Sequence, residues 1–169
     1  AGDAGGALGA ALALWFKEFK NKRNITNIDT MSGSYLGPSY SEKKIEVDLT
    51  NIKSTFTKLN EKEIINKIAE DLYEGKVVGW FQGKMEFGPR ALGGRSILAS
   101  PLVSDMQKKL NLKVKFRESF RPFAPAVLRE KVSEWFELDT DSPYMLFTTD
   151  VKREKCYEIN TEEKKLFGI

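Results

Sequence analysis

The chain has 169 residues, 41% hydrophobic and 30% charged, a composition typical of one globular domain, or of one domain with part of another. The formal net charge of +3 is too small to indicate a nucleic-acid or membrane partner, so the position of the charges matters more. Histidine is absent, which excludes Ser-His-Asp and Cys-His catalysis and any imidazole-based zinc site within this chain. The single cysteine excludes an intrachain disulfide and agrees with a reducing cytoplasm.

The first predicted element is a helix over residues 6–20, because apolar residues recur there at helical spacing. Asp3 lies just before it, where exposed backbone N–H groups favour a carboxylate. The apolar run stops at Phe16, too short to span a bilayer, and no basic stretch precedes it as in a signal peptide. We therefore expect no membrane partner. Because the chain does not begin with Met, we also expect a fragment of a longer protein.

Residues 21–41 are polar and rich in Asn, Ser and Gly, which predicts a linker or surface arm rather than a packed element. The chain is therefore expected to consist of three parts: a terminal helix in residues 1–20, a linker in 21–41 and a domain in 42–169.

Within residues 42–169, the sequence KIEVDL predicts a strand, and residues 60–75 predict a helix that Asn60 and Glu63 begin and Gly75 ends. Residues 76–81 predict a short buried strand. Two further helices are expected over residues 101–112 and 126–137. Between them, Pro122 and Pro125 require extended backbone.

The segment 83–101 combines four glycines with Lys84, Arg90 and Arg95. Glycines let backbone N–H groups approach an anion, arginine grips phosphate with a planar fork, and lysine adds a point charge. A second basic cluster follows in KVKFRESFRPF. From Lys84 to Arg121 there are nine basic and three acidic residues, a net charge of +6, so the remainder of the chain is acidic.

Solvated surface cations are the simpler interpretation of Lys108, Lys109 and Lys113, which lie on or beside a predicted helix. Arginines set among glycines, aromatics and prolines are better explained by a bound anion, because a partly buried guanidinium needs a compensating charge. Neither GxxxxGK[ST] nor GxGxxG is present. The residues alone therefore predict a site for a multiply charged anion, with phosphate the expected one.

The sequence GWFQGKMEFGPRALGGRSILASP, followed by NLKVKFRESFRPFAPAVL, resembles the C-terminal domain of the carbamoyltransferase family. That family includes O-carbamoyltransferases of aminoglycoside and cephamycin biosynthesis and carbamoyltransferases of nodulation factors. The resemblance is dense over residues 75–137. GDAGGALGAAL resembles the close of the family's N-terminal domain, and YLGPSYSE resembles its connecting segment.

This resemblance implies an α/β (α+β) fold, in which a YrdC-like mixed twisted sheet flanked by helices follows the last helix of an actin-like, sugar-kinase-type domain. It implies a cytoplasmic transferase of biosynthesis that uses carbamoyl phosphate and ATP with Mg²⁺. The enzyme would form carbamoyl-adenylate and transfer the carbamoyl group to a small-molecule hydroxyl. Iron or another divalent metal is expected in the full-length N-terminal domain.

The resemblance also assigns roles to individual residues. A catalytic role falls to Lys84, Arg90 and Arg117. Substrate or phosphate binding falls to Arg95, Ser96, Asn111, Lys115 and Arg121. Asp3 matches a metal-binding acidic position, although a carboxylate at a helix N-terminus is the favoured explanation of this isolated residue. Gly94 departs from the Asn or His expected in many relatives, so a backbone contact is expected there in place of a side chain.

Two other functions remain open from the sequence. An RNA-binding YrdC-like module would use Phe87, Phe116, Phe120 and Phe123, which interleave with cations. Core packing is the simpler explanation of these aromatic residues, so a nucleic-acid partner is disfavoured. The third possibility is a scaffold whose site is inactive.

Overall fold

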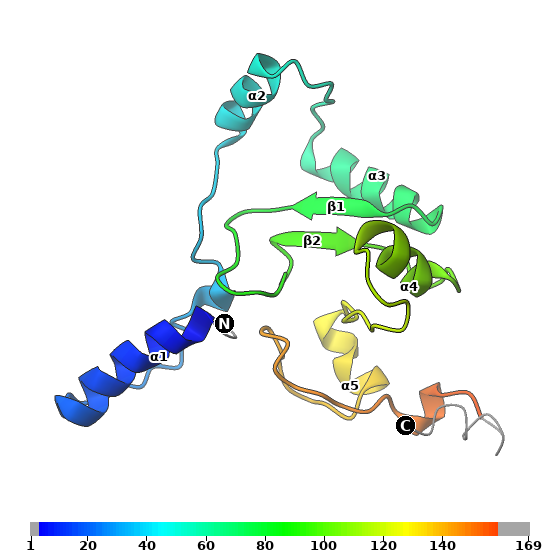
Figure 1. Cartoon of the computed structure of the whole chain (residues 1–169). Coiled ribbons are helices and arrows are strands. Elements are labelled where there is room, and N and C mark those ends of the chain that lie inside the picture. Colours follow the sequence, from blue (N-terminus) through cyan, green and yellow to red (C-terminus); the bar gives the residue numbers. More distant parts are fainter. Residues whose placement is uncertain (1–3, 159–169) are drawn as a thin grey trace. The chain divides into compact units, whose positions relative to one another are not determined.

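The computed structural model describes residues 4–158 (Figure 1). The chain divides into two compact units, Ala1–Phe123 and Ala124–Ile169. The first contains the helices α1 (Gly5–Ala13), α2 (Glu42–Asn51), α3 (Glu61–Tyr73) and α4 (Met106–Lys109), with the strands β1 (Val78–Phe81) and β2 (Arg95–Leu98). The second contains α5 (Val132–Trp135). Helices with a small antiparallel sheet confirm the mixed α/β class, whereas the YrdC-like topology stays a prediction.

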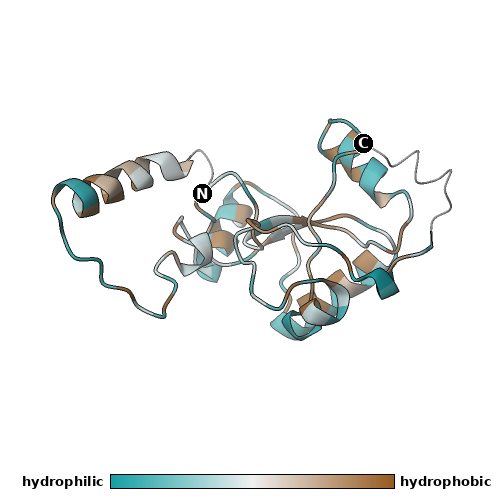
Figure 2. Cartoon of the chain, turned by 90° about the horizontal axis from the view of Figure 1, so that it is seen from below, coloured by the Kyte–Doolittle hydropathy of each residue, from teal (hydrophilic) through white to brown (hydrophobic). Residues whose placement is uncertain are grey.

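The predicted N-terminal helix is confirmed, with α1 continuing as a π-helical turn over Leu14–Glu18. Figure 2 shows this helix as mostly apolar, with hydrophilic residues only at its C-terminal end. Its large side chains, among them Leu12 and Trp15, are exposed in the structure. Asp3 lies outside the described residues.

The strand predicted for KIEVDL is wrong, because these residues form helix α2. The hydroxyl of Ser41 accepts a hydrogen bond from the N–H of Lys44 and so caps the helix. Lys44 also pairs with Asp48 one turn later, at 2.6 Å. The alternation of apolar and polar residues suggested a strand, but Ile45 and Leu49 are also four residues apart and share a helix face.

Helix α3 has the predicted beginning and end. The side-chain oxygen of Asn60 accepts the N–H of Glu63 at 3.0 Å, and the Glu63 carboxylate accepts the N–H of Asn60 at 2.8 Å. The helix ends at Tyr73, and Gly75 follows two residues later with a φ of +77°, a left-handed conformation that favours glycine. Helix α3 contacts β1, which follows directly (Figure 1).

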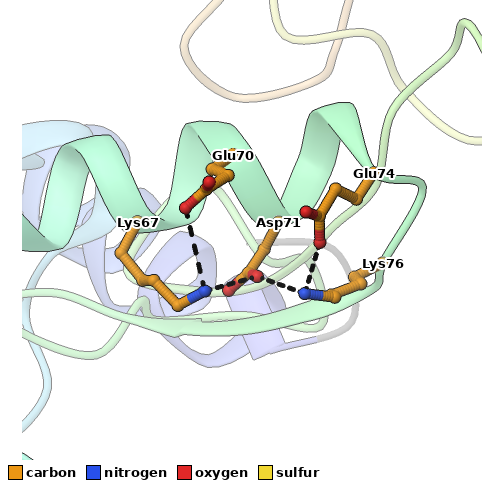
Figure 3. Close-up of polar contacts among 5 residues, drawn as sticks. All are labelled: Lys67, Glu70, Asp71, Glu74 and Lys76. Carbon is orange, nitrogen blue, oxygen red and sulfur yellow. Dashed lines mark hydrogen bonds and ion pairs between the residues drawn. The ribbon is translucent and has the colours of Figure 1, made fainter.

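Charged side chains link the last turn of α3 to the residue that leads into β1 (Figure 3). The Asp71 carboxylate accepts hydrogen bonds from Lys76 at 2.8 Å and from Lys67 at 2.9 Å, and these two partners lower its pKa. Hydrogen bonds to Asp71 and Glu74 raise the pKa of Lys76. The lysines are exposed, so these pairs orient the turn more than they stabilise it.

Strands β1 and β2 form an antiparallel pair in which Val78 lies opposite Leu98 and Phe81 opposite Arg95. The strand predicted over residues 76–81 is thus confirmed, but it is only partly buried. Val78 and Trp80 are half-buried, while Phe81 is 78% exposed. Strand β2 was not predicted, because its residues follow the glycines that drew attention to a loop.

The predicted helix over 101–112 begins later, at Met106, and continues as a π-helical turn over Leu110–Val114. Met106 and Leu110 are the buried hydrophobic residues of the described chain, and their spacing of four places them on one face. The helix predicted over residues 126–137 is reduced to a 3₁₀ turn at Arg129–Lys131 followed by α5, since residues up to 128 lie in extended or irregular backbone.

Unit 2 is held by local polar contacts. The guanidinium of Arg129 grips the Asp141 carboxylate with two hydrogen bonds, at 2.6 and 3.1 Å. After α5, Phe136 forms an isolated antiparallel bridge with Val151. The Lys155 ammonium lies 5.0 Å from the centre of the Trp135 ring, within the range of a cation–π contact.

We expect Asn60→Ala to lower the free energy of unfolding by about 1 kcal/mol, because it removes the acceptor that caps α3. Asn60→Ser keeps an acceptor and should stay close to the wild type. Urea-induced unfolding followed by circular dichroism checks both variants. Equal stability of the alanine variant and the wild type would contradict a role for this cap.

Candidate functional site

The loop between β1 and β2, residues 82–94, is organised around the carboxylate of Glu86. This side chain is 7% exposed, and one of its oxygens, Oε1, accepts three backbone hydrogen bonds. The donors are the N–H groups of Leu92 at 2.7 Å, Gly94 at 2.7 Å and Arg95 at 3.1 Å. Burial raises the pKa of Glu86, but hydrogen bonds from these N–H groups and from its own N–H outweigh burial, so the pKa is lowered.

Gly94 has no room for a side chain. A Cβ atom at this position would lie 2.7 Å from the carbonyl oxygen of Lys84 and 3.1 Å from the Glu86 carboxyl carbon. The backbone of Gly94 must therefore approach Glu86 closely, which only glycine allows. The N–H of Gly94 donates to Glu86, and the expectation that its backbone replaces a side chain in contacting a ligand stays a prediction.

The side chain of Arg95 closes the base of the same loop. Its Nη1 donates to the carbonyls of Gly94 at 2.7 Å and Gly83 at 3.2 Å, and its guanidinium lies 4.6 Å from the centre of the Phe81 ring. The hydroxyl of Ser96 accepts the N–H of Gly93 at 3.1 Å. Arg95 and Ser96, both predicted to bind phosphate, thus hold the loop together in the structure.

Residues 34–38, which we call the connecting segment, pack against the start of this loop. The N–H of Gly37 donates to the Met85 carbonyl at 2.9 Å, and the N–H of Met85 donates to the Pro38 carbonyl at 3.1 Å. The N–H of Phe87 donates to the Ser34 carbonyl at 2.6 Å, and Ser34 is buried. The prediction of an unpacked arm is therefore wrong for these residues, because their backbone is paired with the loop.

A pocket of about 270 Å³ lies between the connecting segment and the loop. It is lined by Tyr35, Gln82, Gly83, Lys84, Gly93 and Gly94. Lys84 is exposed and is one of the residues that line this pocket. The indole N–H of Trp80 donates to the Gln82 side-chain oxygen at 3.2 Å, which orients that amide. The pocket therefore combines backbone, an amide, a phenol and one cation.

A second network centres on Asn111, which is fully buried. Its Nδ2 donates to the carbonyls of Ser119 at 3.0 Å and Arg121 at 2.8 Å, and its Oδ1 accepts Nε of Arg117 at 2.7 Å. The Arg117 guanidinium lies 4.9 Å from the centre of the Phe123 ring. Asn111 was predicted to bind substrate, and in the structure it positions Arg117 and the backbone that follows.

The remaining predicted site residues are more exposed. Arg121 pairs with Glu118 at 2.9 Å, and the N–H of Glu118 itself, followed by Arg121, lowers the pKa of that carboxyl. Lys115 and Arg90 are exposed. The structure places Arg95 and Ser96 in one network, beside the pocket that Lys84 lines, and Asn111, Arg117 and Arg121 in another. Within residues 4–158, no hydrogen bond or ion pair joins the two networks.

Sequence reasoning did not single out Tyr35, Gln82 or the organising role of Glu86. A signal for Glu86 was available, because it is the one acidic residue in a segment of glycines and cations. Tyr35 carried no such signal, since it lies in a polar stretch that resembles a linker. Its place in the pocket depends on pairing between segments about 50 residues apart.

No metal site is found among residues 4–158, where no group of three or more His, Cys, Asp and Glu side chains could hold an ion. Asp3, the predicted metal residue, lies outside the described part of the chain. No helix within that part is long and apolar enough to cross a membrane.

Comparison with known proteins confirms the resemblance to the carbamoyltransferase family that the glycine-rich, cationic segment indicated. The family described as "Carbamoyltransferase C-terminus" matches residues 69–163, and the chain belongs to this family. The match includes β1, the loop, β2 and both cationic networks, while the connecting segment lies before it.

Several curated proteins are similar to this chain. An uncharacterized protein of Synechocystis is 51% identical over 100% of this chain and 28% of its own length. Nodulation protein NolO of Bradyrhizobium diazoefficiens is 39% identical over 90% of this chain and 28% of its own. The 3'-hydroxymethylcephem-O-carbamoyltransferase of Streptomyces clavuligerus is 42% identical over 52% of this chain and 16% of its own. The chain thus spans under a third of the length of these relatives.

We expect Gly94→Ala to destabilise the chain by about 1–3 kcal/mol, because the added methyl group would press on the Lys84 carbonyl and force the backbone to shift. Gly79→Ala is the matched control, since a Cβ there meets nothing within 4 Å. Thermal or urea unfolding of both variants measures the difference. If the two substitutions had the same small effect, close packing at Gly94 would be refuted.

The lowered pKa of Glu86 predicts a specific loss of stability in acid. Its stabilising contribution is complete above the unfolded-state pKa of about 4.3, and it disappears as pH falls through the lower folded-state value. Glu86→Gln should therefore be less stable than the wild type at pH 7, by about 1–3 kcal/mol, because neutral hydrogen bonds replace charge-assisted ones. Unfolding measured from pH 7 to pH 3 should show this difference shrinking below about pH 4. A difference that does not change with pH would contradict this assignment.

Proposed function

We propose that this chain supplies the phosphate-ligand pocket of an ATP-dependent carbamoyltransferase. In this proposal it binds carbamoyl phosphate and ATP with Mg²⁺ and forms carbamoyl-adenylate, whose carbamoyl group passes to an acceptor hydroxyl. Overall, carbamoyl phosphate, ATP and water give carbamoyl-adenylate, pyrophosphate and inorganic phosphate. Water first cleaves carbamoyl phosphate into carbamate and inorganic phosphate. A carbamate oxygen then bonds to the α-phosphorus of ATP, and the bond from that phosphorus to pyrophosphate breaks.

The observation that carries this proposal is the pocket at Lys84, because all of its lining residues except Tyr35 lie within the region that matches the carbamoyltransferase family. The curated relatives include one whose name states O-carbamoyltransferase activity on a hydroxymethylcephem. That name belongs to a longer protein, so for this chain the activity is an inference from similarity and from the pocket together.

Anion recognition in this pocket falls to side chains more than to backbone. The N–H groups of Leu92, Gly94 and Arg95 already donate to Glu86, and that of Gly93 donates to Ser96. Backbone at these glycine-rich positions therefore shapes the pocket rather than gripping phosphate. Lys84 is the charged residue of the lining, and in this proposal its ammonium group offsets negative charge that develops on phosphoryl oxygens.

The metal implied by the family is not assigned to the described residues. Among residues 4–158 no cluster of suitable ligands is present, and no step of the proposed chemistry is derived through iron. Mg²⁺ would arrive with ATP, coordinated largely by phosphate oxygens and water.

Binding of single-stranded RNA is the second candidate function, and one observation favours it. Phe116 is 84% exposed and Phe120 is also well exposed, so core packing does not explain these aromatic residues in the structure. Exposed aromatic rings beside cations can stack on bases. The family match favours the carbamoyltransferase function, and the salt dependence of binding separates the two.

We expect Lys84→Ala to weaken the binding of carbamoyl phosphate roughly tenfold, because it removes the cation that lines the pocket. Lys108→Ala is the control, since this exposed lysine lies on α4 and does not line the pocket. Isothermal titration calorimetry measures both variants, and pyrophosphate release with ATP measures adenylate formation. Equal weakening by the two substitutions, with a steep salt dependence, would favour RNA binding instead.

A further inference from the structure

The connecting segment contributes more than a covalent link. Three backbone hydrogen bonds fix it against residues 85–87, at 2.6, 2.9 and 3.1 Å. Ser34, at the start of this segment, is buried. The backbone on either side of residue 35 is therefore fixed against the loop, which limits where its side chain can lie.

Tyr35 is that side chain. Its hydroxyl donates a hydrogen bond to the carbonyl of Leu92, 57 residues away in sequence. The same oxygen lies 3.2 Å from where a Cβ of Gly93 would stand, so a side chain at Gly93 would crowd the phenol. Tyr35 thus bridges the connecting segment and the far end of the glycine-rich loop.

The phenol also lines the pocket. Tyr35 faces it from the connecting segment, whereas Gln82, Gly83, Lys84, Gly93 and Gly94 line it from the loop. Among residues 4–158, no other lining residue comes from outside the loop. A ligand held at Lys84 therefore occupies a space of about 270 Å³ that Tyr35 bounds on the other side.

We infer that Tyr35 is a ligand-contacting residue of this pocket, and that the connecting segment is part of the phosphate site. The inference rests on the proposed function, because it takes the ligand to be a small phosphorylated molecule beside Lys84. The ring forms a wall against the ligand. The hydroxyl is held by the Leu92 carbonyl, so it fixes the loop rather than gripping phosphate.

The first test compares two tyrosines of the same region. Tyr35→Ala should weaken the binding of carbamoyl phosphate and of inorganic phosphate roughly tenfold, measured by calorimetry on the purified chain. Tyr40→Ala is the matched control, because Tyr40 is 61% exposed and does not line the pocket, and it should bind like the wild type. Circular dichroism establishes that both variants are folded.

The second test needs no destabilising variant. The chain has five tyrosines, and ring-labelled tyrosine gives each a separate NMR signal. Tyr35→Phe identifies the Tyr35 signal by its loss. Titration of the wild type with carbamoyl phosphate should shift the Tyr35 signal in step with binding and leave that of Tyr40 unchanged.

The outcomes distinguish this inference from the proposed function. If the wild type binds phosphate ligands but the Tyr35 signal does not move at saturation, the inference is overturned and the proposed function stands. If Tyr35→Ala is folded and binds like Tyr40→Ala, the same conclusion follows. If the folded wild type binds no phosphate ligand, both the proposed function and the inference are overturned.

Discussion

The carboxylate of Glu86 is the group on which the candidate site depends, because it gathers backbone N–H groups from across the glycine-rich loop onto a single oxygen. A buried carboxylate is costly unless hydrogen bonds compensate it, and here they are sufficient to lower its pKa. The loop backbone is therefore folded around the Glu86 carboxylate. Gly94 is required at the closest approach, and Arg95 secures the base by donating to carbonyls.

This arrangement changes the expected division of roles among the basic residues. The glycines and arginines predicted that backbone N–H groups would bind phosphate. In the structure, the N–H groups of Gly93 and Gly94 instead donate to the side chains of Ser96 and Glu86. Arg95 is occupied by carbonyls and by the Phe81 ring, and Arg117 by Asn111 and the Phe123 ring. These arginines hold backbone and aromatic groups in place. Among the residues that line the pocket, Lys84 is the cation that an external ligand would meet.

Local signals in the sequence predicted local structure well. The capping pair Asn60 and Glu63 and the terminal Gly75 specify α3 within 16 residues, because their contacts are made between near neighbours. The strand prediction for KIEVDL was wrong because its apolar residues fit both the two-residue period of a strand and the 3.6-residue period of a helix. The hydrogen bond from the N–H of Lys44 to the Ser41 hydroxyl favours the helix. Strand β2 was missed because its partner β1 lies beyond a loop, and pairing across a loop leaves no periodic mark in a four-residue strand.

The site was predictable to the same extent. The motif placed Lys84 and the glycines correctly in one segment, since they are close in sequence. It could not reveal which donors are already satisfied, because that depends on the geometry of a folded loop. Nor could it reveal Tyr35, whose contact with Leu92 forms only when the connecting segment pairs with residues 85–87. A segment that looks like a linker in composition can thus be a wall of the pocket, because backbone pairing requires no particular side chains. The proposed phosphate site is therefore formed by two backbone segments, the connecting segment and the loop, which hydrogen bonds hold together. Tyr35 from the first segment and Lys84 from the second line the pocket between them.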